Sequence, residues 1–113
     1  MANSLPLGVI QPTPGTPLDL FGNFPDLRLK PFSCNNIYIQ VLTGNLTDVY
    51  IGKTNLNKGT RVGLISVLRP PTANHLPDYV LWIPNASNAI FPAEYRVDVD
   101  NANDGIIATL FFQ

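Results

Sequence analysis

Eleven prolines are spread along this chain of 113 residues, and their spacing leaves little room for helices. A proline inside a helix removes a backbone hydrogen bond and clashes with the preceding turn. No segment keeps an i, i+3, i+4 apolar pattern over three turns, whereas valine, isoleucine, threonine, tyrosine and phenylalanine are plentiful. These residue types favour strands. The sequence therefore predicts an all-β protein.

Several segments combine strand-forming residues with apolar character, and turn-forming residues separate them. They are residues 37–42, 49–53, 61–68, 78–83, 95–100 and 106–112, with weaker candidates for edge strands at 16–21 and 27–32. Gly44-Asn45 is expected to turn the chain between the first two strands. Short strands separated by turns predict an antiparallel two-sheet β-sandwich, jelly-roll-like, of about seven or eight strands.

Residues 95–100 show the clearest strand pattern, because Tyr95, Val97 and Val99 alternate with charged side chains. This alternation is typical of a strand with one buried and one solvated face. Asp104-Gly105 follows, and this dipeptide favours positive φ angles at both central positions of a tight turn. The sequence therefore predicts a hairpin between the last two strands, turned at Asp104-Gly105.

The predicted hairpin fixes which side chains of the last strand face inward. Val99 is expected opposite Leu110 in the core, so that Ile107 and Phe111 point to the outer face. Each of these two side chains would lose roughly 1.5–3 kcal/mol of burial if it stayed in water. We therefore expect another part of the chain, or another subunit, to cover that face.

The first 25 residues differ from the rest, because they place apolar side chains among closely spaced prolines. Such a segment is too apolar for a disordered linker and too broken for a helix. We expect residues 1–25 to form an extended Pro-rich arm that becomes ordered on a neighbouring subunit, and residues 26–113 to form the β-sandwich domain. The expected contact residues of the arm are Leu5, Leu7, Val9 and Ile10.

The composition argues against several classes of partner. Charged residues make up only 13% of the chain, the net charge is −1, and there is no basic cluster to bind nucleic acid. No apolar run approaches the roughly 20 residues that span a bilayer, and the N-terminus lacks a signal-peptide pattern. The single cysteine, Cys34, indicates stability from packing and synthesis in a reducing cytosol.

Residues 98–105 are rich in oxygen-bearing side chains, as calcium-binding loops are. Counted from Asp98, the residues at positions 5, 6 and 12 do not fit an EF-hand. A looser cation site of Asp98, Asp100 and Asp104 is the alternative to a solvated strand face and turn, which we favour. The same carboxylates have a spacing near that of inverting glycosidases, but every alternating strand offers that spacing. We expect no metal or cofactor.

Cys34 and His75 are the only thiol and the only imidazole, and nothing in the sequence places them together as a nucleophile pair. The chain has no nucleophile-elbow motif, no phosphate-binding glycine loop and no zinc-ligand spacing. The sequence therefore indicates a protein that is not an enzyme.

Four aromatic side chains are candidates for a stacking platform that binds sugar: Trp82, Tyr79, Tyr38 and Tyr50. Trp82 and Tyr79 have opposite parity on one strand, so at least one of them is expected in the core. We favour packing roles for these rings.

The loop 84–94 carries Ile90 and Phe91 near a proline. Apolar residues at the tip of a long loop are unusual unless the loop folds back or docks on a partner. These two residues are therefore a second candidate contact.

The order of segments along the chain resembles that of small structural proteins of tailed bacteriophage virions. A Pro/Gly-rich arm at residues 12–17 precedes a strand pair at 37–40 and 49–52, and a Tyr-x-Val-Asp strand, an Asn/Asp/Gly turn and an apolar strand follow. The resemblance covers about two-thirds of the chain. It implies a β-sandwich that attaches to a capsid or tail surface as a decoration, cement or adaptor protein, and it carries over no catalytic residues.

The residues and the resemblance together predict a non-enzymatic virion structural protein that is made in the host cytoplasm. We expect a capsid decoration or cement (head auxiliary) protein, homo-oligomeric, that docks on the major capsid protein or other virion proteins through its arm and an apolar sheet face. The alternatives are a phage neck or tail adaptor and a carbohydrate-binding β-sandwich module for host recognition.

Overall fold

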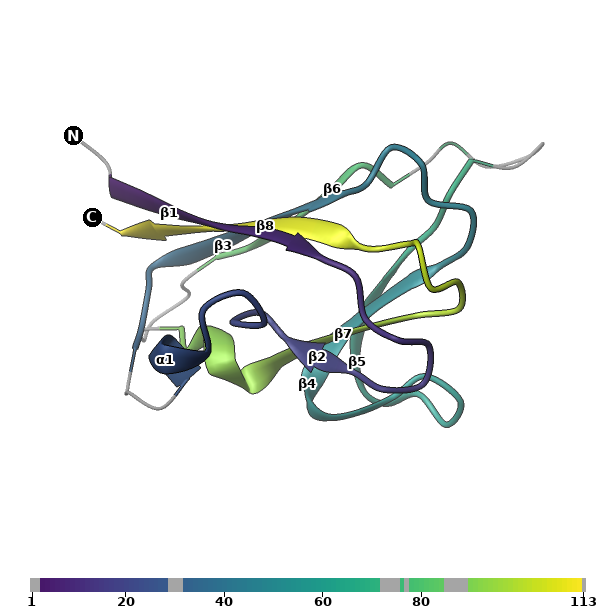
Figure 1. The fold of residues 1–113 in the computed structure, drawn as a ribbon, viewed down its shortest axis with the longest axis horizontal. Helices are drawn as coiled ribbons and strands as arrows, with labels where there is room; N and C mark the ends of the chain where they lie inside the picture. Colours follow the sequence, from purple (N-terminus) through teal and green to yellow (C-terminus); the bar gives the residue numbers. More distant parts are fainter. Residues whose placement is uncertain (1–2, 29–31, 72–75, 77, 85–89, 113) are drawn as a thin grey trace.

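The computed structural model describes residues 3–28, 32–71, 76, 78–84 and 90–112. Two four-stranded antiparallel sheets face each other (Figure 1), as the predicted all-β sandwich requires. The first sheet has the order β1-β8-β3-β6, with strands β1 (Asn3–Ile10), β8 (Ile106–Phe112), β3 (Asn36–Val41) and β6 (Val80–Ile83). The second sheet has the order β2-β7-β4-β5, with strands β2 (Leu18–Asp19), β7 (Tyr95–Val99), β4 (Val49–Asn57) and β5 (Val62–Leu68).

The strand pairing is nested along the chain, because the first strand pairs with the last and each following strand pairs with the next one in from the end. β1 pairs with β8, β2 with β7, β3 with β6 and β4 with β5. β8 also pairs with β3, and β7 also pairs with β4, which completes each sheet. Among the described strands only β4 and β5 are both consecutive and paired, so every other connection crosses from one sheet to the other.

The core lies between the two sheets and follows the alternation of each strand. In β8, Ile106 and Leu110 are fully buried, whereas Ile107 and Phe111 are only partly buried on the outer face, as their parity predicts. The fully buried apolar side chains of the other strands are Leu7, Ile37, Ile39, Val49, Ile51, Val97 and Val99.

The last two strands do not form the predicted hairpin, because they belong to different sheets. β7 pairs with β2 and β4, whereas β8 pairs with β1 and β3. The strands expected at 37–42 and 49–53 are likewise divided between the sheets, as β3 and β4. Alternation along a strand reports which face is buried and does not report which strand lies beside it.

The turn before β8 has a different role from the one predicted. Asp104 is buried, and its carboxylate accepts hydrogen bonds from the backbone N–H groups of Leu46 and Thr47. Gly105 lies against the chain after β1, where an added Cβ would come within 2.2 Å of the Ile10 carbonyl oxygen. Asp104-Gly105 therefore carries the chain across one end of the sandwich, and the prediction of a tight hairpin there is wrong.

Residues 3–10 form β1, an edge strand of the first sheet, where a separate arm was expected. Leu7 and Ile10 are 0% and 2% exposed and belong to the one core. The Nδ2 group of Asn23 donates hydrogen bonds to the backbone carbonyls of Leu7, at 3.0 Å, and of Val9, at 2.8 Å. The structure differs from the expected arm because β8 offers β1 a pairing edge within the same chain.

The proline-rich segment after β1 forms a tight turn. The N–H of Thr16 donates a hydrogen bond to the carbonyl of Thr13 at 2.9 Å, and Gly15 between them has a φ angle of 83°. Pro14 followed by glycine at positive φ is the pattern of a type II turn. The N–H of Gly15 also donates to the Asp98 carboxylate at 2.9 Å, so the turn is bound to β7.

Two short helices complete the described structure: α1 (Pro25–Arg28) and the 3-10 helix η1 (Pro92–Glu94). The weaker strand candidate at 27–32 is therefore wrong at its start, which lies in α1, and residues 29–31 lie outside the described residues. The other weak candidate, at 16–21, contains the two-residue strand β2.

Candidate functional site

The four strands of the first sheet contain no charged residue. By contrast, Asp19, Lys53, Arg96 and Asp98 all lie in strands of the second sheet. Charged side chains on an outer face normally keep a sheet in water and discourage contact with other chains. The first sheet lacks this protection, and its outer face is therefore the leading candidate for contact with another molecule.

The outer face of the first sheet is also apolar. Val9 of β1 is 46% exposed, and Val80 and Trp82 of β6 are each 47% exposed. Ile107 and Phe111 of β8 lie on the same face between these two edge strands. Exposed apolar side chains that are grouped in this way mark surfaces that bind protein or other ligands.

Three rings on this face are in contact. The ring centroids of Tyr38 and Trp82 are 5.7 Å apart at an interplanar angle of 62°, and those of Trp82 and Phe111 are 5.7 Å apart at 46°. The rings come from β3, β6 and β8, so the cluster spans three strands. Sequence reasoning listed Tyr38 and Trp82 together as candidates for a stacking platform but did not join Phe111 to them, because that contact depends on strand order. The expectation that Trp82 or Tyr79 lies in the core is wrong, since both side chains are exposed.

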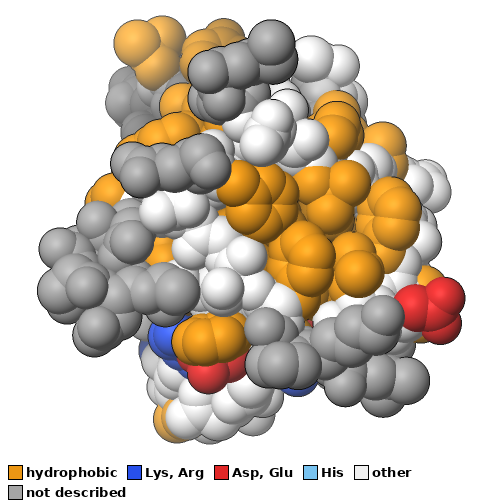
Figure 2. All heavy atoms as spheres, turned by 90° about the vertical axis from the view of Figure 1, so that its left-hand side faces the viewer, with side chains coloured by type: hydrophobic (Ala, Val, Ile, Leu, Met, Phe, Trp, Pro, Cys, Tyr) orange, Lys and Arg blue, Asp and Glu red, His pale blue; other side chains and the backbone are white. Residues whose placement is uncertain are grey.

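A second apolar region lies at the end of the sandwich that carries α1 and both chain ends. Figure 2 shows hydrophobic side chains gathered on this end of the molecule. Phe21, Phe32 and Phe112 form a chain of edge-to-face contacts, with centroids 5.6 Å apart in each pair and interplanar angles of 88° and 86°. Phe21 is fully buried and the other two rings pack against the core, so these contacts close this end of the sandwich.

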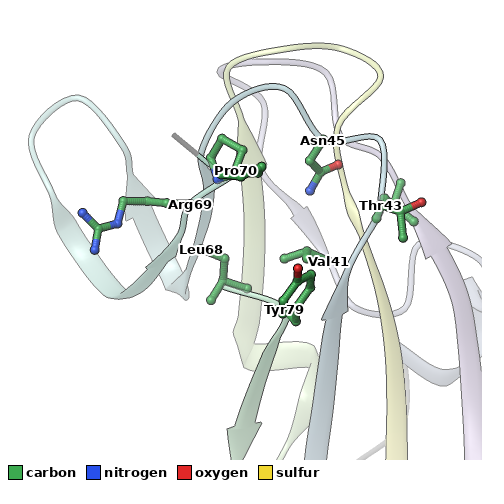
Figure 3. Close-up of a pocket in the computed structure, with 9 residues that line it drawn as sticks. Val41, Thr43, Asn45, Leu68, Arg69, Pro70 and Tyr79 are labelled. Carbon is green, nitrogen blue, oxygen red and sulfur yellow. The ribbon is translucent and has the colours of Figure 1, made fainter. Parts of the chain in front are cut away.

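The opposite end of the sandwich carries a cleft of about 310 Å³ (Figure 3). Its lining is mostly apolar, and Val41, Leu68 and Tyr79 lie toward one another in it, whereas the guanidinium of Arg69 points away. The full lining is Val41, Leu42, Thr43, Asn45, Leu68, Arg69, Pro70, Pro71 and Tyr79. A cleft of this size and lining suits a few apolar groups.

The outer face of the second sheet carries a polar cluster around Tyr50. The hydroxyl of Tyr50 donates a hydrogen bond to Asp100 at 2.8 Å, and Lys58 forms an ion pair with Asp100 at 2.9 Å. Burial, followed by the Asp100 hydrogen bond, raises the pKa of Tyr50 to about 12. The hydrogen bond from Lys58 lowers the pKa of Asp100. These contacts stabilise the neutral phenol of Tyr50 beside a carboxylate and disfavour the phenolate.

The acidic segment 98–105 does not gather its carboxylates at one point. Asp98 and Asp104 are each 1% exposed and accept hydrogen bonds from separate backbone segments, while Asp100 pairs with Lys58. Within the described parts of the chain, no group of three histidine, cysteine, aspartate or glutamate residues is placed to hold a metal ion. The solvated strand that we favoured for Asp98 is also wrong, since the Pro14-Gly15 turn covers this carboxylate.

The predicted contact residues divide into two groups. Leu7, Ile10 and Ile90 are 0%, 2% and 9% exposed, so they serve the core, and Leu5 packs against it. Ile90 exchanges backbone hydrogen bonds with Cys34 at 2.8 and 3.0 Å. The surface group consists of Val9, Ile107, Phe111 and the exposed Phe91.

Cys34 is buried, and burial raises the pKa of its thiol to about 11, which makes it a poor nucleophile. His75, the other member of the nucleophile pair that was considered, lies outside the described residues.

Comparisons with protein-family models, with curated proteins and with solved structures find no match to this chain. No helix in the described ranges is long and apolar enough to cross a lipid bilayer. The function is therefore inferred from the fold and from the surface of the molecule.

Proposed function

We propose that this chain is a non-enzymatic structural protein of a virion, and specifically a capsid decoration or cement protein. In this proposal it docks on the major capsid protein through the outer face of the first sheet. The observation that carries the proposal is that this face is apolar and free of charge across four strands.

Physical chemistry supports docking at this face. Val9, Val80 and Trp82 leave about half of their surface in water, so covering each would contribute about 1 kcal/mol or more. A partly exposed aromatic cluster supplies the kind of anchor that dominates binding energy at protein interfaces. An uncharged face also avoids the cost of taking charges out of water when the contact forms.

We further infer that the sandwich is a jelly roll. The nested pairing of β1 with β8, β2 with β7, β3 with β6 and β4 with β5 supports this topology, because a rolled antiparallel ribbon pairs its strands in that order. Jelly rolls include viral capsid domains and lectins, which suits both the main proposal and its sugar-binding alternative. In this proposal residues 3–10 do not act as an extended arm, because they form β1. They contribute to docking through the side chain of Val9.

Quantitative mass spectrometry of purified particles of the source virus tests the virion role. Decoration predicts a copy number comparable to that of the main shell protein. A dozen or fewer copies per particle would support the neck or tail adaptor, and complete absence from particles would overturn the virion proposal.

A pair of matched substitutions tests the docking face. Trp82→Glu places a charge on the first sheet, and Ile65→Glu places one on β5 of the second sheet, where Ile65 is exposed to a similar degree at 46%. We expect Trp82→Glu to abolish attachment to particles and Ile65→Glu to leave attachment intact. Equal attachment of the two variants would overturn docking through the first sheet.

The aromatic cluster favours one alternative function, a carbohydrate-binding module. Trp82 is exposed between Tyr38 and Phe111, and Gln40 on the neighbouring strand adds an exposed amide without charge. Aromatic rings with neutral hydrogen-bonding groups are suited to sugars. Glycan-array binding that is lost in Trp82→Ala would favour this alternative, while an array without signal would leave the docking proposal standing alone.

A further inference from the structure

The loop between β3 and β4 is held in place by a buried carboxylate. Asp104 is 1% exposed, and it accepts hydrogen bonds from the backbone N–H groups of Leu46, at 2.9 Å, and Thr47, at 2.7 Å. The hydroxyl of Thr47 donates a third hydrogen bond to the same carboxylate. Hydrogen bonds to a buried charged group are among the stronger ones in proteins, so this loop is fixed to the turn before β8.

A second pair of hydrogen bonds fixes the same loop. The side chain of Asn45 donates from Nδ2 to the Gly105 carbonyl at 2.9 Å and accepts from the Gly105 N–H at 3.0 Å. Asn45 and Leu46 are therefore both held by the turn at residues 101–105. The loop loses little further freedom when it binds, which is the condition for a preorganised contact.

The residue that this rigid loop presents to solvent is apolar. Leu46 is 72% exposed, although its own backbone N–H is fixed by Asp104. Single exposed leucines are common, but this one stands on a loop whose position two buried or partly buried polar residues determine. Leu46 is therefore an apolar anchor whose burial in another molecule would carry little cost for ordering its loop.

The cleft of Figure 3 lies directly beside this anchor. Asn45, the residue before Leu46, lines the cleft together with Val41, Leu42 and residues from the connection that follows β5. Its volume of about 310 Å³ and its apolar lining are suited to an aliphatic side chain. One end of the molecule thus presents an apolar projection and an apolar recess side by side.

The charges at this end do not oppose contact between identical surfaces. Residues 42–47 include no charged side chain. Arg69 is the one charged residue that lines the cleft, and its Nε lies 3.8 Å from the Asp78 carboxylate while its guanidinium points away from the recess. Among the described residues of the loop and the cleft lining, the one charged side chain is thus paired within its own copy, so a contact between two copies would bring no unpaired charge from these residues.

We propose that two copies of this chain associate end to end about a two-fold axis, with Leu46 of each copy seated in the cleft of the other. A projection and a recess on the same patch are what an isologous interface needs. The contact uses the end of the sandwich away from the chain termini (Figure 1), so the outer face of the first sheet stays free. This inference is independent of the virion proposal, because it concerns a different surface.

Sedimentation velocity of the full chain over a range of concentrations is the first test. We expect a monomer–dimer equilibrium whose dissociation constant rises about tenfold or more in Leu46→Asp. The matched control is Ile65→Asp, on an exposed position of β5 outside the contact, which should leave the dissociation constant unchanged. A chain that is monomeric at every concentration, or a dimer that Leu46→Asp leaves intact, would overturn the proposal.

Disulfide trapping in trans tests the geometry. Leu46→Cys chains are mixed with Pro71→Cys chains that carry a mass tag, and mild oxidation is expected to give the mixed dimer. The pairing of Leu46→Cys with Ile65→Cys is the control, and equal yields from the two mixtures would contradict the reciprocal contact. The native Cys34 is buried and does not interfere. Trp82→Glu is expected to dimerise normally, which separates this contact from docking through the first sheet.

Discussion

Asp104 shows how much structure one buried carboxylate organises. It lies at the crossing from the second sheet to the first, and the groups that it binds belong to the loop between β3 and β4, almost 60 positions earlier, with separations of 57 and 58 residues. The two connections are thereby held together at one end of the sandwich. The sequence gives no sign of this role for Asp104. An aspartate in a turn-forming segment looks the same in the sequence whether its carboxylate is exposed or buried.

Replacing Asp104 by alanine is expected to lower the free energy of unfolding by about 3 kcal/mol, because it leaves two part-buried N–H donors without their acceptor. Equilibrium urea unfolding measures this loss. Asp26→Ala is the control, since Asp26 is exposed in α1 and its replacement should change the free energy of unfolding by no more than about 0.5 kcal/mol. Equal losses in the two variants would refute the structural role of Asp104.

The hydroxyl of Tyr50 is expected to ionise about two pH units later than an ordinary tyrosine, with its pKa at about 12 against the usual 10.0. Burial and the hydrogen bond to Asp100 both disfavour the phenolate. The difference between the phenolate absorbance titrations of the unaltered chain and of Tyr50→Phe isolates this group. Asp100→Asn should move the midpoint down, and a midpoint near 10 in the unaltered chain would contradict the contact.

The same pKa shifts determine how this cluster affects stability. Because folding raises the pKa of Tyr50, its contribution is complete below pH 10 and is lost as the pH rises toward about 12. Folding lowers the pKa of Asp100, so its contribution is present above the usual value of 3.8 and is lost as the pH falls below it. Between these limits the cluster contributes in full.

Among the strands, β1 is the element whose place in the fold the sequence did not predict. The prolines and Gly8 suggested a thread, but a proline is tolerated in an edge strand, and the register of β1 against β8 shifts between Pro6 and Gly8. The apolar residues Leu7 and Ile10 already indicated a need for burial. What the sequence could not show is that the burial site is the chain's own core.

Leu7→Ala is expected to cost about 2–5 kcal/mol of unfolding free energy, because it leaves a cavity in the core. Val9→Ala, two residues along the same strand, should cost less than about 1 kcal/mol, since Val9 is nearly half exposed. Thermal or urea unfolding of both variants distinguishes a core strand from an arm. If β1 were a free arm, neither substitution would change the stability of the domain.

The strands themselves were predictable to a large extent, and their partners were not. The segment 106–112 was predicted with the bounds of β8, and the segment 95–100, predicted from its alternation, contains β7 and extends one residue beyond it. The predicted hairpins failed because turn propensity at Gly44-Asn45 and Asp104-Gly105 is local, while pairing is decided by the order of strands in the sheets. The connections at those positions cross the sandwich and are fixed by long-range contacts to Asp104 and Asn45.

Across the whole molecule, the two outer faces differ in charge. The low charged fraction of the chain was visible in the sequence, and reading the strands of the first sheet together would have shown that none is charged. Grouping these four strands together, however, required knowledge of the sheet order. The contact between Trp82 and Phe111 and the end cleft were likewise missed, because both are built from segments that are distant in the sequence.

Docking through an uncharged face is expected to resist salt. Screening in 1 M salt weakens exposed charge–charge contacts, for which the Debye length falls to about 3 Å, but it leaves apolar contacts intact. Particles washed in high salt should therefore retain the protein in full, as quantified by gel densitometry against the shell protein. Release by salt would show that charged groups hold the protein in place, and it would contradict docking through the first sheet.

The nested pairing has a mechanical consequence. Asn3 lies opposite Phe112, so the two ends of the chain leave the fold from adjacent strands on the same side. A force that pulls these two ends apart would break the hydrogen bonds between β1 and β8 one after another, and would therefore open this pair of strands at a low load. A force that pulled β1 and β8 in opposite directions along their length would instead load all the hydrogen bonds of this ladder at once, so the resistance of the fold depends on where it is held.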